Sequence, residues 1–139
     1  MRSNTLLTRA VAVFALAAGL VACGASETEV QLVVQNNHRV LDRFTLSRLE
    51  QLPQVQVATP QSHRVQQGPS VRSILDAAGA TGVISVRVEG RDPAQTLTVG
   101  ELDDRTILGF TKRHTLKLTG AKLSRDQWVR DVTDLVVNP

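Results

Sequence analysis

Residues 83–89 read Val-Ile-Ser-Val-Arg-Val-Glu, and this two-residue alternation decides the fold class. Successive side chains of a strand point to opposite faces of a sheet. The apolar face carries Ile84, Val86 and Val88, and the polar face carries Ser85, Arg87 and Glu89. We therefore predict a strand with one face in the core and the other in water.

The same alternation, rich in β-branched residues, recurs along the rest of the chain and predicts further strands. These are expected at residues 30–35, 54–59, 63–66, 95–99, 107–111, 115–119 and 129–137. Most of them follow one another without an intervening helix, which argues against a doubly wound fold. No segment repeats, so residues 30–139 are predicted to form one strand-rich, mixed α+β domain.

Two short helices are expected between the strands. The first spans residues 47–52 and is marked by the capping-box spacing of its first and fourth residues. The second spans residues 71–78, where apolar residues recur at helical spacing, Ser70 can cap the first turn and Gly79 can end the helix. Residues 100–105 can form a third turn.

Residues 1–22 have the layout of a secretory signal. Arg2 and Arg9 precede an unbroken apolar run that ends in small residues, and no acidic residue occurs among them. The run from Ala10 to Cys23 is shorter than the roughly 20 apolar residues that a membrane-spanning helix needs. It is therefore interpreted as a segment that is cleaved off.

Leu20-Val21-Ala22-Cys23 resembles the bacterial lipobox, in which the cysteine is acylated and becomes N-terminal. The resemblance implies an exported protein that is lipid-anchored to the cell membrane and faces the extracytoplasmic side. Residues 23–29 would then be the lipidated cysteine and a short, small and polar tether. The alternative is that Cys23 is an incidental residue of an ordinary signal peptide.

The charge balance disfavours nucleic acid as a partner. Removal of residues 1–22 takes two of the 16 basic residues and leaves 14 against 13 acidic ones. These bases are scattered among acids instead of forming a stripe, and such a chain has no field that would gather a polynucleotide.

Arg125, Trp128 and Arg130 form the one local group of bulky and basic residues. They can bind an anion or stack a ring. The alternative is that the indole closes the core while both guanidinium groups lie in water.

Other candidates for chemistry are weaker. His38, His63 and His114 occur singly, without the clustered ligands of a metal site, and are expected in loops. Asp103 and Asp104 are expected in an exposed, charged turn. The sequence contains no phosphate-binding loop, dinucleotide fingerprint or nucleophile elbow.

Three stretches together resemble the oxidoreductase molybdopterin-binding domain, which has the sulfite-oxidase-type fold. Residues 44–53 read Phe-Thr-Leu-Ser-Arg-Leu-Glu-Gln-Leu-Pro, residues 68–79 read Gly-Pro-Ser-Val-Arg-Ser-Ile-Leu-Asp-Ala-Ala-Gly, and residues 127–137 read Gln-Trp-Val-Arg-Asp-Val-Thr-Asp-Leu-Val-Val. The matching features are a helix that ends at Leu-Pro, a helix that ends at Ala-Gly and a closing strand. They imply a fold much more than an activity.

The chain departs from this family at the positions that carry its chemistry. Residues 54–67, where a metal-ligating cysteine is expected, contain none, and residues 112–119 lack the pterin-contact motif. Arg130 matches the basic residue of the closing strand, and it is carried over as a cofactor-binding candidate together with its neighbour Arg125. The resemblance thus implies a minimal member of the family.

Three functions remain open. The favoured one is a tethered, non-catalytic binding or accessory module without metal or cofactor, whose small-molecule ligand is unknown. The second is a molybdopterin-dependent oxidoreductase, or a subunit of one, that binds its cofactor without a protein thiolate, with His63 and the two arginines as residues to test. The third is a structural protein of the envelope that docks a partner protein.

The lipobox interpretation makes a direct prediction. Cys23→Ser removes the acylated sulfur, so the protein should move from the detergent-extracted membrane fraction to the soluble fraction, because membrane affinity comes from buried acyl methylenes. Cell fractionation with immunoblotting measures this. Recovery of the variant in the membrane fraction would contradict lipidation at this residue.

Overall fold

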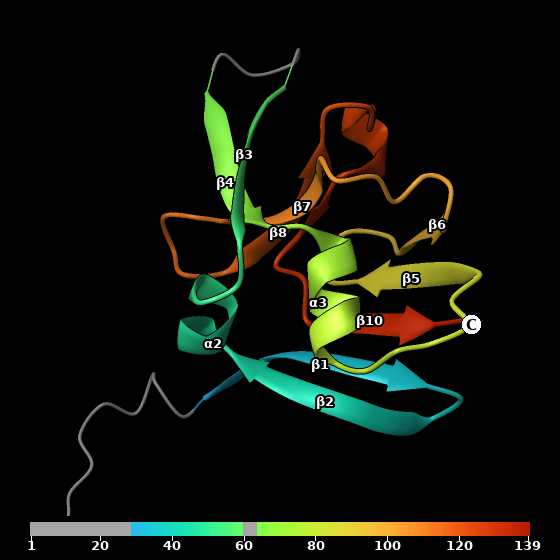
Figure 1. The fold of residues 1–139 in the computed structure, drawn as a ribbon. Coiled ribbons are helices and arrows are strands. Elements are labelled where there is room, and N and C mark those ends of the chain that lie inside the picture. Colours follow the sequence, from blue (N-terminus) through green and yellow to red (C-terminus); the bar gives the residue numbers. More distant parts are fainter. Residues whose placement is uncertain (1–28, 60–63) are drawn as a thin grey trace, which may run out of the picture.

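The computed structural model describes residues 29–59 and 64–139, whose arrangement is shown in Figure 1. Within these ranges the chain is strand-rich and α+β, with two short α-helices, as the alternation predicts. Cys23, most of the tether and His63 lie outside the described residues. Within the same ranges no helix has both the length and the apolar character needed to cross a membrane.

The larger sheet has five strands in the order β2-β1-β10-β5-β6. These strands are β1 (Val30–Asn36), β2 (Arg39–Thr45), β5 (Ser85–Glu89), β6 (Gln95–Thr98) and β10 (Asp134–Val137). Neighbours are antiparallel except β1 and β10, which pair in parallel with Val33 opposite Asp134. The last strand of the chain therefore lies in the middle of the sheet.

The core lies against one face of this sheet. Alternate residues in β1, β5 and β10 are buried, as are Phe44 of β2 and Leu97 of β6. These side chains join one cluster with those of helix α3 (Val71–Ala77), which lies against the sheet in Figure 1. The backbone N–H of Ser73 donates to Ser70 Oγ at 3.1 Å, and Gly79 has φ +77°. Both the predicted cap and the predicted end of this helix are confirmed.

A second, three-stranded sheet has the order β7-β8-β9, and a hairpin β3-β4 packs on it. The strands of this sheet are β7 (Thr106–Phe110), β8 (Leu116–Gly120) and β9 (Val129–Arg130), and those of the hairpin are β3 (Gln54–Ala58) and β4 (Val65–Pro69). Helix α2 (Leu46–Glu50) precedes the hairpin, and the 3₁₀ turn η1 (Arg125–Gln127) precedes β9. Strand β4 crosses β7 at Gly68, where a Cβ would overlap the carbonyl oxygen of Leu108. Only glycine permits this approach.

The prediction of one strand over residues 129–137 is wrong. The segment divides into β9 and β10, which belong to different sheets. Between them Asp131 adopts φ +51°, and the N–H of Val132 donates to the Leu116 carbonyl at 2.9 Å. The left-handed residue turns the chain from one sheet to the other, which a run of β-branched residues does not indicate.

Other differences are local. Strand β2 was not predicted, because two register irregularities in its pairing with β1 obscure its alternation. Helix α2 begins after Thr45, whose hydroxyl accepts from Arg48 N at 3.2 Å, and not at Ser47. Ile84 precedes β5 and is 72% exposed, so it does not join the core face. Residues 100–105 form turns without a helix.

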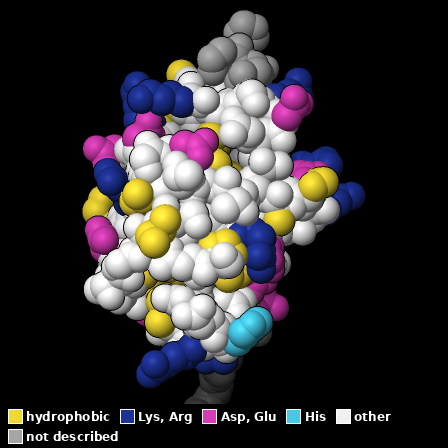
Figure 2. Space-filling model, turned by 90° about the vertical axis from the view of Figure 1, so that its right-hand side faces the viewer, with side chains coloured by type: hydrophobic (Ala, Val, Ile, Leu, Met, Phe, Trp, Pro, Cys, Tyr) yellow, Lys and Arg dark blue, Asp and Glu magenta, His cyan; other side chains and the backbone are white. Residues whose placement is uncertain are grey.

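The surface carries mixed charge on the side that is turned to the viewer in Figure 2, where basic and acidic side chains lie next to one another. This agrees with the nearly balanced composition of residues 23–139. Among the ion pairs of the described residues, Arg48–Asp42 at 2.7 Å and Arg87–Glu89 at 2.6 Å are between partly exposed side chains. Such pairs contribute little to stability.

The crossing at Gly68 predicts a large effect of a small substitution. Gly68→Ala should lower the free energy of unfolding by about 1–3 kcal/mol or more, because the new methyl group forces β4 away from β7. Gly100→Ala is the matched control, since its Cβ would meet no atom closer than 3.9 Å. Urea unfolding measures both, and equal stability of the two variants would show that the strands do not approach this closely.

Candidate functional site

A cavity of about 400 Å³ lies where β8, β9, η1 and the β5–β6 loop meet. Its lining consists of Asp92, Pro93, Gln95, Lys117, Arg125, Asp126, Trp128 and Arg130. The three residues singled out from the sequence, Arg125, Trp128 and Arg130, are thus brought to one site. Asp92 and Lys117 were not predicted, because Asp92 lies 38 residues from Arg130 and Lys117 is placed beside Arg130 only by the β8–β9 pairing.

A close backbone crossing lies next to the cavity and positions two of its lining residues, Asp92 and Arg130. A Cβ on Gly90 would lie 2.6 Å from the carbonyl oxygen of Arg130, so only glycine fits. The next residue, Arg91, donates its N–H to that carbonyl at 2.8 Å. The crossing places Asp92 directly beside β9.

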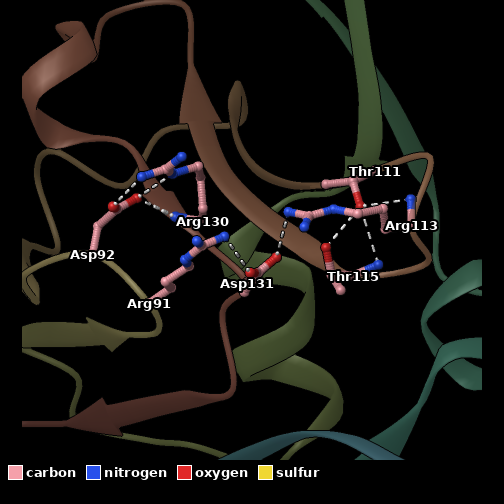
Figure 3. Close-up of polar contacts among 7 residues, drawn as sticks. All are labelled: Arg91, Asp92, Thr111, Arg113, Thr115, Arg130 and Asp131. Atoms are coloured by element: carbon pink, nitrogen blue, oxygen red, sulfur yellow. Dashed lines mark hydrogen bonds and ion pairs between the residues drawn. The ribbon is translucent and has the colours of Figure 1, made fainter.

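Arg130 is held by Asp92, as Figure 3 shows. One carboxylate oxygen, Oδ2, accepts from the Arg130 backbone N–H at 2.8 Å and from Nε at 3.0 Å, while Oδ1 accepts from Nη2 at 2.9 Å. These hydrogen bonds lower the pKa of Asp92 to about 2 and raise that of Arg130. The Arg130 guanidinium group is exposed, but the Asp92 carboxylate is its counter-ion and holds it in one orientation.

Lys117, unlike Arg130, has no carboxylate partner among the described residues. It lies directly opposite Arg130 in the β8–β9 pairing, so the two side chains share a face of the sheet. It is half-buried, and no ion pair joins it to any of the described residues. Burial lowers the pKa of its ammonium group, and the nearby charges of Arg125 and Arg130 lower it further.

Arg125 begins the 3₁₀ turn η1. The turn is fixed by the side-chain oxygen of Gln127, which accepts from Ser124 N at 3.1 Å. Arg125 itself is exposed and forms no ion pair within the described part of the chain. Asp126, the other acidic residue of the lining, is exposed.

Trp128 joins the core to the cavity. Its ring packs on the hydrophobic cluster and carries the Lys117 ammonium group 4.5 Å from its centroid. The face under the ammonium is thus occupied by a cation–π contact. The indole N–H is buried and has no acceptor among the described residues. Trp128 thus packs against the core and also lines the cavity, and its contact with a bound anion or ring stays a prediction.

A second polar cluster adjoins the first (Figure 3). Asp131 accepts from Arg113 Nη2 at 3.5 Å and lies 3.7 Å from Arg91 Nη1, so one carboxylate is shared by two guanidinium groups. The hydroxyl groups of Thr111 and Thr115 are 2.7 Å apart and close the turn that carries Arg113. This cluster links the β5–β6 loop, the β7–β8 turn and the segment after β9.

The remaining candidates have structural roles. His38 and His114 lie in turns, with φ +65° and +62°, as expected for loop residues. Asp103 accepts from Arg105 N at 2.8 Å and from Thr106 Oγ1 at 3.2 Å, which confirms a turn. Over the described ranges, no three His, Cys, Asp or Glu side chains gather in a way that could hold a metal ion.

Comparison with known proteins adds no assignment. No family model matches the chain, and no curated protein is similar to it in sequence.

The Asp92–Arg130 pair makes a prediction about pH. Its contribution to stability should be fully present above the ordinary carboxyl pKa of 3.8 and should be lost as the pH falls through about 2, because protonation of Asp92 removes the anion. Arg130→Gln should raise the Asp92 pKa toward 3.8, whereas Arg125→Gln should raise it much less. Carboxyl ¹³C shifts measure this, and an unchanged pKa in Arg130→Gln would contradict the pairing.

Proposed function

We propose that this protein is an exported, lipid-anchored module that binds a small anion in the cavity at Lys117. The observation that carries the proposal is the placement of this ammonium group. It is half-buried, lies opposite one arginine and near a second, and has no acidic partner among the described residues. Each of these features destabilises the unliganded domain, and an anion would relieve all of them.

Electrostatics favours a negatively charged ligand. Like charges directly opposite in a sheet are unfavourable, and so is the burial of a charged group without a partner. A bound anion would reduce both penalties and would accept charge-assisted hydrogen bonds, which are stronger than neutral ones. Because Asp92 already neutralises Arg130, the cations left for a ligand are those of Lys117 and Arg125.

The cavity favours an anionic group over an aromatic ring as the bound moiety. The face of Trp128 beneath Lys117 is covered, so it offers no platform for stacking there. A volume of about 400 Å³ suits a small ligand or one end of a larger one.

The fold proposal is a minimal molybdopterin-binding domain without its redox centre. It is supported by the order of the three stretches that resemble that family and by the strand-rich α+β architecture. The only cysteine of the chain is Cys23, in the segment interpreted as the anchor, and residues 29–59 and 64–139 contain no thiol. Since these residues do not fit the usual thiolate-ligated metal, the proposed activity is binding alone.

The location proposal comes from the sequence. The signal-like residues 1–22, the lipobox-like Leu20–Cys23 segment and the short tether support a domain held close to the outer surface of a membrane. At seven residues from Cys23, Val30 can lie no farther than about 25 Å from the anchor. A binding module there would meet ligands of the cell envelope.

The proposal predicts saturable binding of inorganic phosphate, measured by calorimetry on the full chain in neutral detergent. Lys117→Gln should weaken binding by at least about tenfold, since a hydrogen bond to a charged group contributes about 1.5–3 kcal/mol. Lys122→Gln is the control, because Lys122 is 83% exposed and pairs with Asp103. Fluorescence of Trp128, the only tryptophan, gives a second readout.

Two outcomes would contradict this proposal. Equal affinity of the wild type and Lys117→Gln for phosphate would place the bound anion elsewhere. Stoichiometric molybdenum or pterin, found by mass spectrometry of protein from a host that makes molybdopterin, would support the enzyme instead.

A further inference from the structure

Lys117 also lines a second hollow. This hollow, of about 260 Å³, lies between the β7–β8 turn and the start of β4, and Arg64, Phe110 and Lys112 are among its lining residues. The first cavity draws on β9, η1 and the β5–β6 loop, whereas the second draws on β4 and β7. The Lys117 ammonium group therefore lines two hollows that are built from different elements.

The pairing of the three-stranded sheet explains this arrangement. Lys117 lies on the middle strand, with Arg130 opposite it on β9 and Gly109 opposite it on β7. Residues opposite one another share a face of the sheet, so a line across the strands runs from Arg130 over Lys117 to Gly109. A Cβ on Gly109 would lie 3.5 Å from the Gln67 carbonyl oxygen and 3.7 Å from the Gln66 side chain, so β4 packs over β7 next to Lys117 and supplies the other wall of the second hollow.

The two hollows together concentrate positive charge. Apart from Arg64, the described residues of their linings include four basic ones, Lys112, Lys117, Arg125 and Arg130, and two acidic ones, Asp92 and Asp126. Asp92 is already paired with Arg130. The second hollow has no acidic residue in its lining. Residues 23–139 as a whole have 14 basic and 13 acidic residues, so this face carries an excess that the rest of the surface offsets.

We propose that the ligand is a linear polyanion that lies across the three-stranded sheet, with one anionic group at Lys117 and Arg125 and a following group at Lys112. This inference rests on the proposed anion binding and names its ligand class. Two separate small anions would both depend on the single Lys117 ammonium group and would repel each other. Two anionic groups on one chain avoid the second entropic cost, because binding of the second is intramolecular.

Phe110 gives the spacer between the anionic groups an apolar contact. Its ring is partly buried at the edge of the core and lines the second hollow beside Lys112. Lys112 is exposed and forms no ion pair with any residue that the structure describes, so its ammonium group is available. A phosphate chain and an acidic oligosaccharide both carry anionic groups in series, but only the oligosaccharide has C–H groups between them that could contact Phe110.

The test compares anions of increasing length on the full chain in neutral detergent at fixed ionic strength. Calorimetry with inorganic phosphate, tripolyphosphate and long-chain polyphosphate should give an affinity per chain that rises by at least about tenfold along the series. Lys112→Gln should remove that gain and leave phosphate binding unchanged. Lys122→Gln should preserve both. A sulfated oligosaccharide of matched charge shows which source binds more tightly.

The outcomes separate the two proposals. Phosphate binding that depends on Lys117 but does not strengthen with chain length would overturn the polyanion inference and leave the proposed function intact. A length-dependent gain that persists in Lys112→Gln would also overturn it. If none of the anions binds, both proposals fail. Circular dichroism of Lys112→Gln checks that this exposed substitution leaves the fold unchanged.

Discussion

The backbone crossing at Gly90 is the contact on which the relation between the two sheets depends. On one side of it the chain leaves the five-stranded sheet, and on the other side it passes from β9 to β10. Thr133 N donates to the Glu89 carbonyl at 2.9 Å, and Arg91 N donates to the Arg130 carbonyl at 2.8 Å, so hydrogen bonds hold the crossing on both sides of the glycine. Any larger residue at position 90 would push apart the two segments that carry Asp92 and Arg130.

The same crossing determines the charge state of the site. It brings one carboxylate to Arg130 and none to Lys117, although the two cations are neighbours on one face of the sheet. A sheet selected for stability alone would place an acid or a neutral residue opposite Arg130. Asp92 pairs with Arg130 and the Trp128 ring contacts Lys117, so part of this cost is offset within the domain, and the proposed anion would offset more of it.

Much of the fold was predictable because its signals are local. Alternation indicated most strands, and Ser70 and Gly79 indicated both ends of α3. Strand β2 was missed where bulges interrupt the period, and the break at Asp131 was missed because a long-range crossing imposes it. The site was half predictable for the same reason. Arg130 stood out from its neighbours in sequence, whereas the importance of Lys117 depends on a strand pairing that sequence spacing does not show.

The position of β10 has a consequence for how the domain acquires its structure. Its residues are the last of the sheet to be made, yet they lie between β1 and β5 and bond to both. A chain that emerges from the ribosome with its N-terminus first therefore has two strand pairs without hydrogen bonds between them until residues 134–137 are free. The five-stranded sheet is therefore completed only after β10 has been made, whereas the β1–β2 and β5–β6 pairs need no later residue.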